Sequence, residues 1–120
     1  MKEGRGMRQV VKATVSELMD MAKSMFGDMV KANVDIARNI MVVDAELHAD
    51  IEQFMLDNGS KQEDIWGINL YPGQFGSTEF IEFDSIINIR PRQGNRSRYV
   101  EDANVRSQIE KIVGEAIVGD

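Results

Sequence analysis

The stretch Met29–Val43, MVKANVDIARNIMVV, decides the fold because it holds two strand-like runs joined by a short turn. Apolar residues at positions 30, 32, 34 and 36 alternate with polar ones, and a period of two is typical of a half-buried strand. Asn39 tolerates the left-handed backbone conformation that a tight turn requires. Residues 40–43 are then the antiparallel partner. We therefore predict a β-hairpin here.

A helix is predicted directly before this hairpin, over residues 14–27. Thr14 and Glu17 have the spacing of a capping box, in which each side chain accepts from a free backbone amide of the helix start. Apolar residues recur every three or four positions up to residue 26, and Gly27 can adopt the positive φ of a helix end. Residues 8–13 alternate weakly, which favours a short edge strand, and residues 1–6 are predicted to be a flexible tail.

Two more helices and two more strands are predicted after the hairpin. Residues 47–57 and 102–117 carry apolar side chains at helical spacing, and Asp102 is a suitable N-cap. The apolar run 65–71 has the length of a central strand. Residues 80–90 also alternate, but these eleven residues exceed the usual strand length of about five or six, so a bulge or break is expected at Asp84–Ser85.

These elements predict an α+β fold with two layers. A mainly antiparallel or mixed sheet of about five strands packs against three helices, in the order βαββαββα, and residues 7–120 form the single domain. We expect the helices to cover one face of the sheet. The other face then presents Lys31, Asn33, Glu82 and Asn88, and it is polar enough to contact water or another subunit.

The composition excludes several classes of protein. The 120 residues contain no cysteine, which excludes a disulfide framework and thiolate chemistry. No segment approaches the roughly 20 apolar residues of a membrane-spanning helix. No apolar stretch follows the basic N-terminus, as it would in a secretory signal. We therefore expect a cytoplasmic protein with no membrane partner.

Charge is distributed unevenly along the chain. The net charge is −6, but residues 44–84 hold ten acidic residues and one lysine, a balance of −9, whereas residues 90–98 hold four arginines and no acid. The overall charge argues against a general affinity for nucleic acid. The separation favours contact between the two regions, within one subunit or across an interface.

Four long blocks of the sequence resemble a small prokaryotic protein family. The blocks are residues 25–28 (MFGD), 46–50 (ELHAD), 58–72 (NGSKQEDIWGINLYP) and 81–98 (IEFDSIINIRPRQGNRSR), and the resemblance extends from about Met7 to Val118. The family is an uncharacterised domain of unknown function. The resemblance therefore implies relatives but no activity and no catalytic residue.

The segment 90–98 is the first candidate site. Guanidinium groups bind phosphates and carboxylates through paired donors, and Gly94 lets backbone amides approach an anion. The predicted anion-binding residues are Arg90, Arg92, Gln93, Asn95, Arg96, Ser97 and Arg98. Two alternatives stay open, in which the arginines pair with acidic residues of the same or a neighbouring subunit, or take part in catalysis.

A metal site is the second candidate. Glu46, His48 and Asp50 supply carboxylate and imidazole ligands near the start of the helix 47–57. Residues two apart point away from each other on a helix, so these three converge only if the helix begins between them. In the alternative, the acids stabilise the positive end of the helix and His48 bonds a backbone group.

The third candidate is a pocket beside the predicted strand 80–90. Glu82, Asp84 and Asn88 fall on one face of that strand, and Trp66 or Tyr71 from a neighbouring strand can complete a pocket with them. The alternative is an ordinary row of polar residues that faces solvent.

These candidates lead to one preferred function and two alternatives. We expect a small homo-oligomeric binding protein whose segment 90–98 engages a phosphate-bearing ligand, a nucleic acid or an acidic partner. The alternatives are a metal-assisted hydrolase of a phosphorylated or nucleic-acid substrate, and a structural protein whose arginines join its subunits. The sequence identifies no cofactor and leaves open whether the protein is an enzyme.

Overall fold

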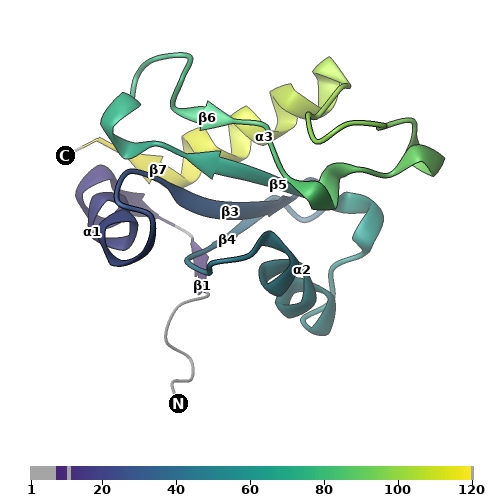
Figure 1. Cartoon of the computed structure of the whole chain (residues 1–120), viewed down its shortest axis with the longest axis horizontal. Helices are drawn as coiled ribbons and strands as arrows, with labels where there is room; N and C mark the ends of the chain where they lie inside the picture. Colours follow the sequence, from purple (N-terminus) through teal and green to yellow (C-terminus); the bar gives the residue numbers. More distant parts are fainter. Residues whose placement is uncertain (1–7, 11, 120) are drawn as a thin grey trace.

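The computed structural model describes residues 8–10 and 12–119 and has an α+β fold, as predicted (Figure 1). The predicted tail 1–6 lies outside the described residues. Within the described part of the chain, none of the helices has the length and apolar character needed to cross a membrane.

The predicted hairpin forms the centre of an antiparallel sheet. β3 (Val30–Asp35) pairs with β4 (Ile40–Val43) on one side and with β5 (Ile65–Leu70) on the other. β1 (Arg8–Val10) and β6 (Ile81–Glu82) form the edges, so the strand order is β1-β4-β3-β5-β6. The backbone at the hairpin turn has a positive φ of 56° at residue 39, as the sequence predicted.

The first predicted helix begins where its capping box requires. α1 (Val15–Met25) starts after Thr14, which accepts from the Glu17 amide at 3.1 Å, and the Glu17 carboxylate accepts from the Thr14 amide at 2.8 Å. Gly27 follows the helix with φ of 92°. Local sequence therefore determines both ends of this element.

The other two predicted helices are α2 (His48–Asp57) and α3 (Ala103–Ala116). The Asp102 side chain caps α3 by accepting from the amide two residues on, at 2.8 Å. The helix ends one residue earlier than predicted because β7 (Ile117–Val118) pairs in parallel with β2 (Ala13–Thr14). These two short strands are additions to the predicted order of elements.

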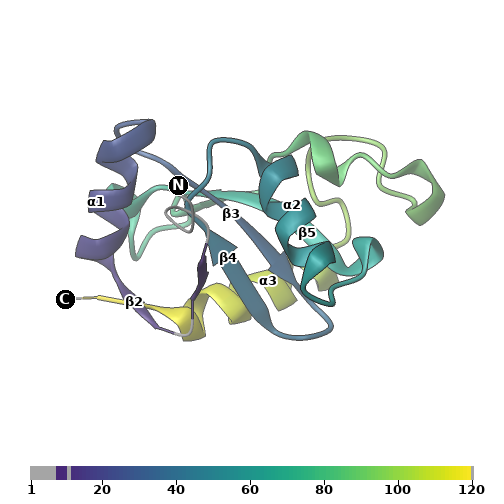
Figure 2. The ribbon, with the colours of Figure 1, turned by 90° about the horizontal axis from the view of Figure 1, so that it is seen from below.

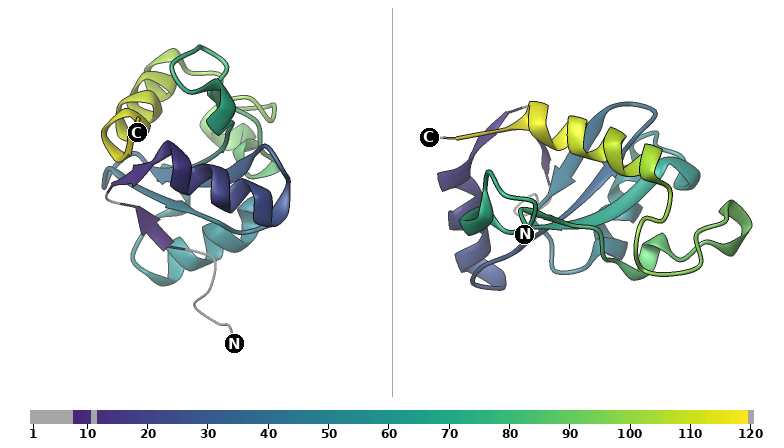
Figure 3. Two further views of the ribbon diagram at one scale, coloured as in Figure 1. Left: turned by 90° about the vertical axis from the view of Figure 1, so that its left-hand side faces the viewer. Right: turned by 90° about the horizontal axis from the view of Figure 1, so that it is seen from above.

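Helices cover both faces of the main sheet, so the expectation of a single covered face is wrong. α3 packs against one face, and α2 packs against the opposite face (Figures 2 and 3). α1 lies at one end of the sheet, where its buried side chains join the apolar cluster of the α3 face. Of the residues expected on a wet face, Glu82 is exposed and Lys31 is half-buried, whereas Asn33 and Asn88 are fully buried. We refer below to the α3 face and the α2 face.

The prediction of a strand over residues 80–90 is wrong beyond Glu82. The chain leaves the sheet after Glu82, just before the expected break. At Ser85 the side-chain hydroxyl accepts from the Ile87 amide and begins the 3-10 turn η3 (Ile86–Asn88). The Asn88 side chain then occupies the position of a paired strand. Its Oδ1 accepts from the Gly67 amide at 2.8 Å and its Nδ2 donates to the Gly67 carbonyl at 2.9 Å.

The segment after this break projects from one end of the molecule (Figures 1 and 3). It contains a further 3-10 turn, η4 (Pro91–Gln93), and two other short 3-10 turns, η1 (Gln62–Asp64) and η2 (Pro72–Gln74), flank β5. The predicted basic segment therefore lies beside the sheet rather than in it.

Candidate functional site

A cavity of about 300 Å³ lies on the α2 face, between the first turn of α2, strand β3 and the projecting segment. It is hereafter the His48 cavity. The residues that line it are Lys31, Leu47, His48, Ala49, Ser85, Ile86, Ile87 and Arg98.

The absence of a side chain at Gly67 makes this arrangement feasible. A Cβ atom at position 67 would lie 2.7 Å from Cβ of Ser85 and 3.1 Å from Cδ2 of His48. Both distances are shorter than ordinary contacts between carbon atoms. Ser85 and His48 therefore pack directly on the backbone of β5.

The His48 imidazole is held in one orientation. Its Nε2 lies 2.8 Å from the carbonyl oxygen of Ile68, and because a carbonyl only accepts, Nε2 carries the proton. Burial lowers the pKa of His48 below its ordinary value of 6.5, against the smaller raising effect of this hydrogen bond. The ring is therefore neutral at pH 7, and Nδ1 keeps a lone pair that can accept a hydrogen bond or a proton.

Two cationic side chains line the His48 cavity. Arg98 forms a bidentate ion pair with Asp84, with 2.6 Å between Nε and Oδ1 and 3.1 Å between Nη2 and Oδ2. These hydrogen bonds lower the pKa of the Asp84 carboxyl. The Lys31 ammonium lies 5.3 Å from the centre of the Phe26 ring, and it forms no ion pair with another described residue. Lys31 is thus the cation with the freer charge.

The first turn of α2 brings the positive end of a helix to the same cavity, and the exposed Asp50 carboxylate in that turn offsets part of its charge. The N-cap residue, Leu47, offers no side-chain acceptor to the first backbone amides of the helix. Such unpaired amides give a helix N-terminus a partial positive charge, which favours a nearby anion. The cavity therefore combines a helix terminus, two cationic side chains and apolar walls.

The other arginines of the segment 90–98 do not reach this cavity. The Arg90 guanidinium donates to the carbonyl oxygens of Gln62 and Ile65 and stacks 4.1 Å from the centre of the Trp66 ring. Arg92 and Arg96 have exposed side chains. Arg90 thus fastens the segment to the start of β5.

The polar residues of the segment hold the loop together. The Asn95 side chain is buried and donates to the carbonyls of Asn88 and Tyr99, at 2.8 and 2.7 Å. The Gln93 side chain donates to a backbone carbonyl of η1 at 3.0 Å, and the Ser97 hydroxyl donates to Glu101 at 2.7 Å. Of the residues predicted to bind an anion, all of which the structure describes, Arg98 alone lines the His48 cavity.

The predicted metal ligands are not brought together. His48 lines the cavity, whereas Glu46 and Asp50 are exposed. Across residues 8–10 and 12–119, no three His, Asp or Glu side chains are grouped so that they could hold a metal ion. His48 bonds a backbone carbonyl, which is the alternative that the sequence left open.

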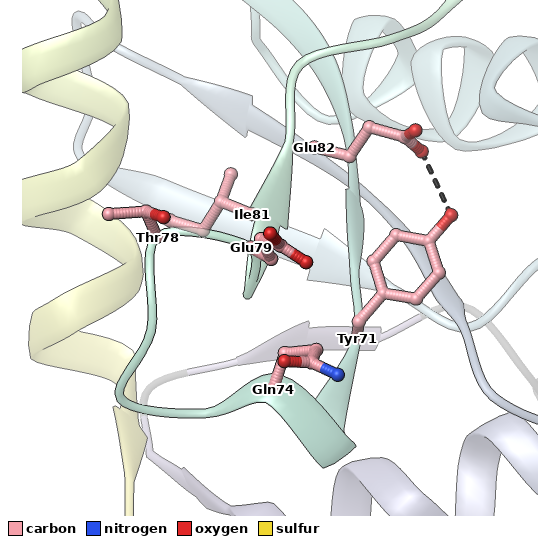
Figure 4. A pocket seen from close by; sticks show the side chains of 6 residues that line it. All are labelled: Tyr71, Gln74, Thr78, Glu79, Ile81 and Glu82. Carbon is pink, nitrogen blue, oxygen red and sulfur yellow. Dashed lines mark hydrogen bonds between the residues drawn. The ribbon is translucent and has the colours of Figure 1, made fainter.

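A second cavity, of about 450 Å³, lies where the chain passes from β5 to β6 (Figure 4). The Tyr71 hydroxyl donates to Glu82 at 3.0 Å, and burial together with this bond raises the pKa of Tyr71 to about 12. Gln74, Thr78, Glu79 and Ile81 complete the lining. Among the described residues that line this cavity, Glu79 and Glu82 are acidic and none is basic, so the cavity does not suit an anion.

The predicted pocket is therefore only partly assembled. Tyr71 and Glu82 meet, but Asp84 pairs with Arg98, and Asn88 is buried against β5. Trp66 belongs to the apolar cluster of the α3 face. Residues an odd number apart on a strand point to opposite faces, and this signal separates Trp66 from Tyr71 in the sequence itself.

Lys31 and Ser85 belong to the His48 cavity, but no candidate site in the sequence included them. Lys31 faces Asn69 across the β3–β5 pairing, and residue 33 faces Gly67. Polar alternation in β3 predicted the orientation of Lys31, but only the strand register brings it beside His48.

Comparisons with known proteins identify a family and no activity. The family model described as "Protein of unknown function (DUF5674)" matches residues 9–116. No curated protein and no solved structure matches the chain. The function therefore has to be inferred from the geometry of the site.

Proposed function

The chain belongs to the DUF5674 family of proteins of unknown function, and we propose that it binds a small molecule with a phosphate or carboxylate group in the His48 cavity. One observation carries this proposal: Lys31 and Arg98 line the same cavity as the first turn of α2. Three parts of the chain thereby offer charge-assisted or dipolar donors to one anionic group.

The net charge of the protein is −6, but the charges that line the cavity nevertheless support binding of an anion. Asp84 occupies Nε and Nη2 of Arg98, and further guanidinium N–H groups remain for a ligand. Lys31 is half-buried, where a charge interacts more strongly than on an open surface. Neutral His48 adds a hydrogen-bond acceptor for a ligand hydroxyl or a protonated phosphate oxygen.

The sequence also predicted an anionic ligand, but it placed the binding site on the segment 90–98 and not in the His48 cavity. Arg90, Gln93, Asn95 and Ser97 make hydrogen bonds within the protein, so they are not available as a cluster of ligands. Arg98 contributes because it lies at the end of the segment that returns to the sheet. Homo-oligomerisation, a cytoplasmic location, and the hydrolase and structural alternatives stay predictions.

Calorimetric titration with inorganic phosphate and with acetate tests the proposal. Loss of a charge-assisted hydrogen bond costs about 1.5–3 kcal/mol, so Lys31→Ala should weaken binding about tenfold or more. Arg92→Ala is the matched control, because this exposed arginine belongs to the same segment but does not line the cavity. Its affinity should stay close to that of the wild type.

Two results would contradict the proposal. One is an equal loss of affinity in Lys31→Ala and Arg92→Ala, which would assign the anion to the protein's overall charge or to the whole segment. The other is absence of binding by the wild type at low ionic strength, where attraction between exposed charges is strongest.

A further inference from the structure

The rim of the His48 cavity is unusually apolar for an exposed surface. Leu47 is 55% exposed and Ile86 is 67% exposed, the two highest values among the large hydrophobic side chains in the described part of the chain. They come from different elements, the N-cap of α2 and the turn η3, and both line this cavity. Single exposed apolar residues are ordinary, but apolar residues that gather at a cavity mark a binding surface.

We infer that the ligand of the His48 cavity is an amphipathic anion, with a phosphate or carboxylate group joined to a compact hydrocarbon or aromatic body. This inference rests on the proposed function. The acidic group meets Lys31 and Arg98. The body lies along Leu47 and Ile86, where it covers apolar surface that is otherwise in water.

The size of the cavity limits the body of the ligand. A volume of about 300 Å³ is at the lower end of the range for small-molecule sites. At about 30 Å³ for each water-sized group, it accommodates about ten non-hydrogen atoms. A phosphate monoester uses half of these for its acidic group, which leaves room for a chain of about five carbons or a single ring. The long acyl chain of a membrane lipid does not fit.

The composition of the walls also selects against a polar body. Ala49 and Ile87 complete the apolar lining, and Ser85 is buried with its hydroxyl accepting from a backbone amide. Along these apolar side chains, a sugar or other group with several hydroxyls would lose more hydrogen bonds to water than the single acceptor of His48 replaces.

Calorimetric titration with inorganic phosphate and with methyl, propyl, pentyl and octyl phosphate tests this inference. Each methylene that enters the cavity should raise the affinity by about two- to fourfold, and the increase should stop near pentyl phosphate. Ile86→Ser should flatten the dependence on chain length, so that it loses more affinity for pentyl phosphate than for inorganic phosphate. Ile89→Ser is the matched control, because Ile89 is also exposed but does not line the cavity.

The outcomes separate this inference from the proposed function. Binding of phosphate that depends on Lys31 but not on chain length overturns the amphipathic ligand and leaves the proposed function intact. A chain-length effect that survives Ile86→Ser, or tighter binding to phosphatidic acid vesicles than to pentyl phosphate, also overturns it. If the wild type binds neither the phosphate series nor the matching alkyl carboxylates, both are overturned. The same series with alkyl carboxylates decides which acidic group is preferred.

Discussion

The two faces of β3 and β5 differ in chemistry, although the same two strands build both. On the α3 face, Val34 and Ile68 are buried in a large apolar cluster. On the α2 face, the neighbouring residues Asn33, Gly67 and Asn69 are buried as well, but two carry amides and one has no side chain. At these positions the α3 face therefore serves stability, whereas the α2 face holds polar groups in position. The apolar packing of the α2 face comes from the separate cluster of Val42, Ile51, Met55 and Ile65.

The hydrogen bonds of the α2 face support this difference. Asn33 donates to the His48 carbonyl at 3.0 Å, and Asn69 donates to Glu82 at 2.8 Å. The Oδ1 atoms of both amides are buried without a partner in the described structure. Burying an unpaired acceptor costs free energy, so these residues stabilise the fold less than apolar residues would. This face is where the His48 cavity lies.

The largest effect is expected from the α3 face. Ile68→Ala should reduce the free energy of unfolding by about 2–5 kcal/mol, because it leaves a cavity in a fully buried core. Asn69→Ala, one residue away on the other face, should cost about 1 kcal/mol, since Asn69 makes part-buried hydrogen bonds and leaves one atom unpaired. Urea denaturation measures both. Equal losses would mean that the two faces contribute alike to stability.

An intermediate effect is expected where the α2 face is most tightly packed. Gly67→Ala should cost about 1–3 kcal/mol, because the new Cβ displaces Ser85 and His48, and it should also weaken phosphate binding. Gly114→Ala is the control, because nothing lies within 4 Å of its new Cβ and the helix α3 favours alanine. Denaturation and calorimetry check the pair. A Gly67→Ala protein as stable as the wild type would contradict the close packing at this floor.

The smallest effect is expected from the ion pair at the edge of the cavity. Asp84 and Arg98 are 38% and 51% exposed, so water and salt screen their pairing and it contributes little to the free energy of unfolding. Because the pKa of Asp84 is lowered in the folded protein, this stability is present above its ordinary pKa of 3.8 and is lost as the pH falls through the folded value.

Urea denaturation of the wild type and Asp84→Asn at several pH values measures this contribution. The difference between the two proteins should be constant above about pH 5 and should disappear in strong acid. A difference that does not change with pH would show that Asp84 acts through packing and not through its charge.

Local sequence predicted the elements whose causes are local. The capping box of α1, the alternation in β3 and the turn at Asn39 each depend on residues a few positions apart, and all three are present. The prediction of a strand over residues 80–90 failed because these residues do alternate between apolar and polar, but only Ile81 and Glu82 pair with β5. The hydrogen bonds of the Asn88 side chain to the backbone of Gly67, which is distant in the sequence, take the place of that strand pairing.

Two residues of the candidate site were predicted from the sequence, but their meeting was not. The sequence identified His48 and Arg98 as candidates, in two separate hypotheses. Their meeting with Lys31 depends on the β3–β5 register and on the return of the projecting segment to the sheet. Arg90 and Arg98 have the same chemistry and lie eight positions apart, yet one stacks on Trp66 and the other lines the cavity. No local pattern distinguishes them.

The proposed position of the anion site is tested most directly by an NMR titration of the ¹⁵N-labelled protein with propyl phosphate. If the ligand binds in the His48 cavity, the largest chemical-shift changes should occur at the backbone amides of Lys31, Ala49, Ser85 and Arg98, which line this cavity. Changes across α3 should be small. The largest shifts at Arg92 and Arg96, in the second cavity beside Tyr71, or on the α3 face would contradict the account.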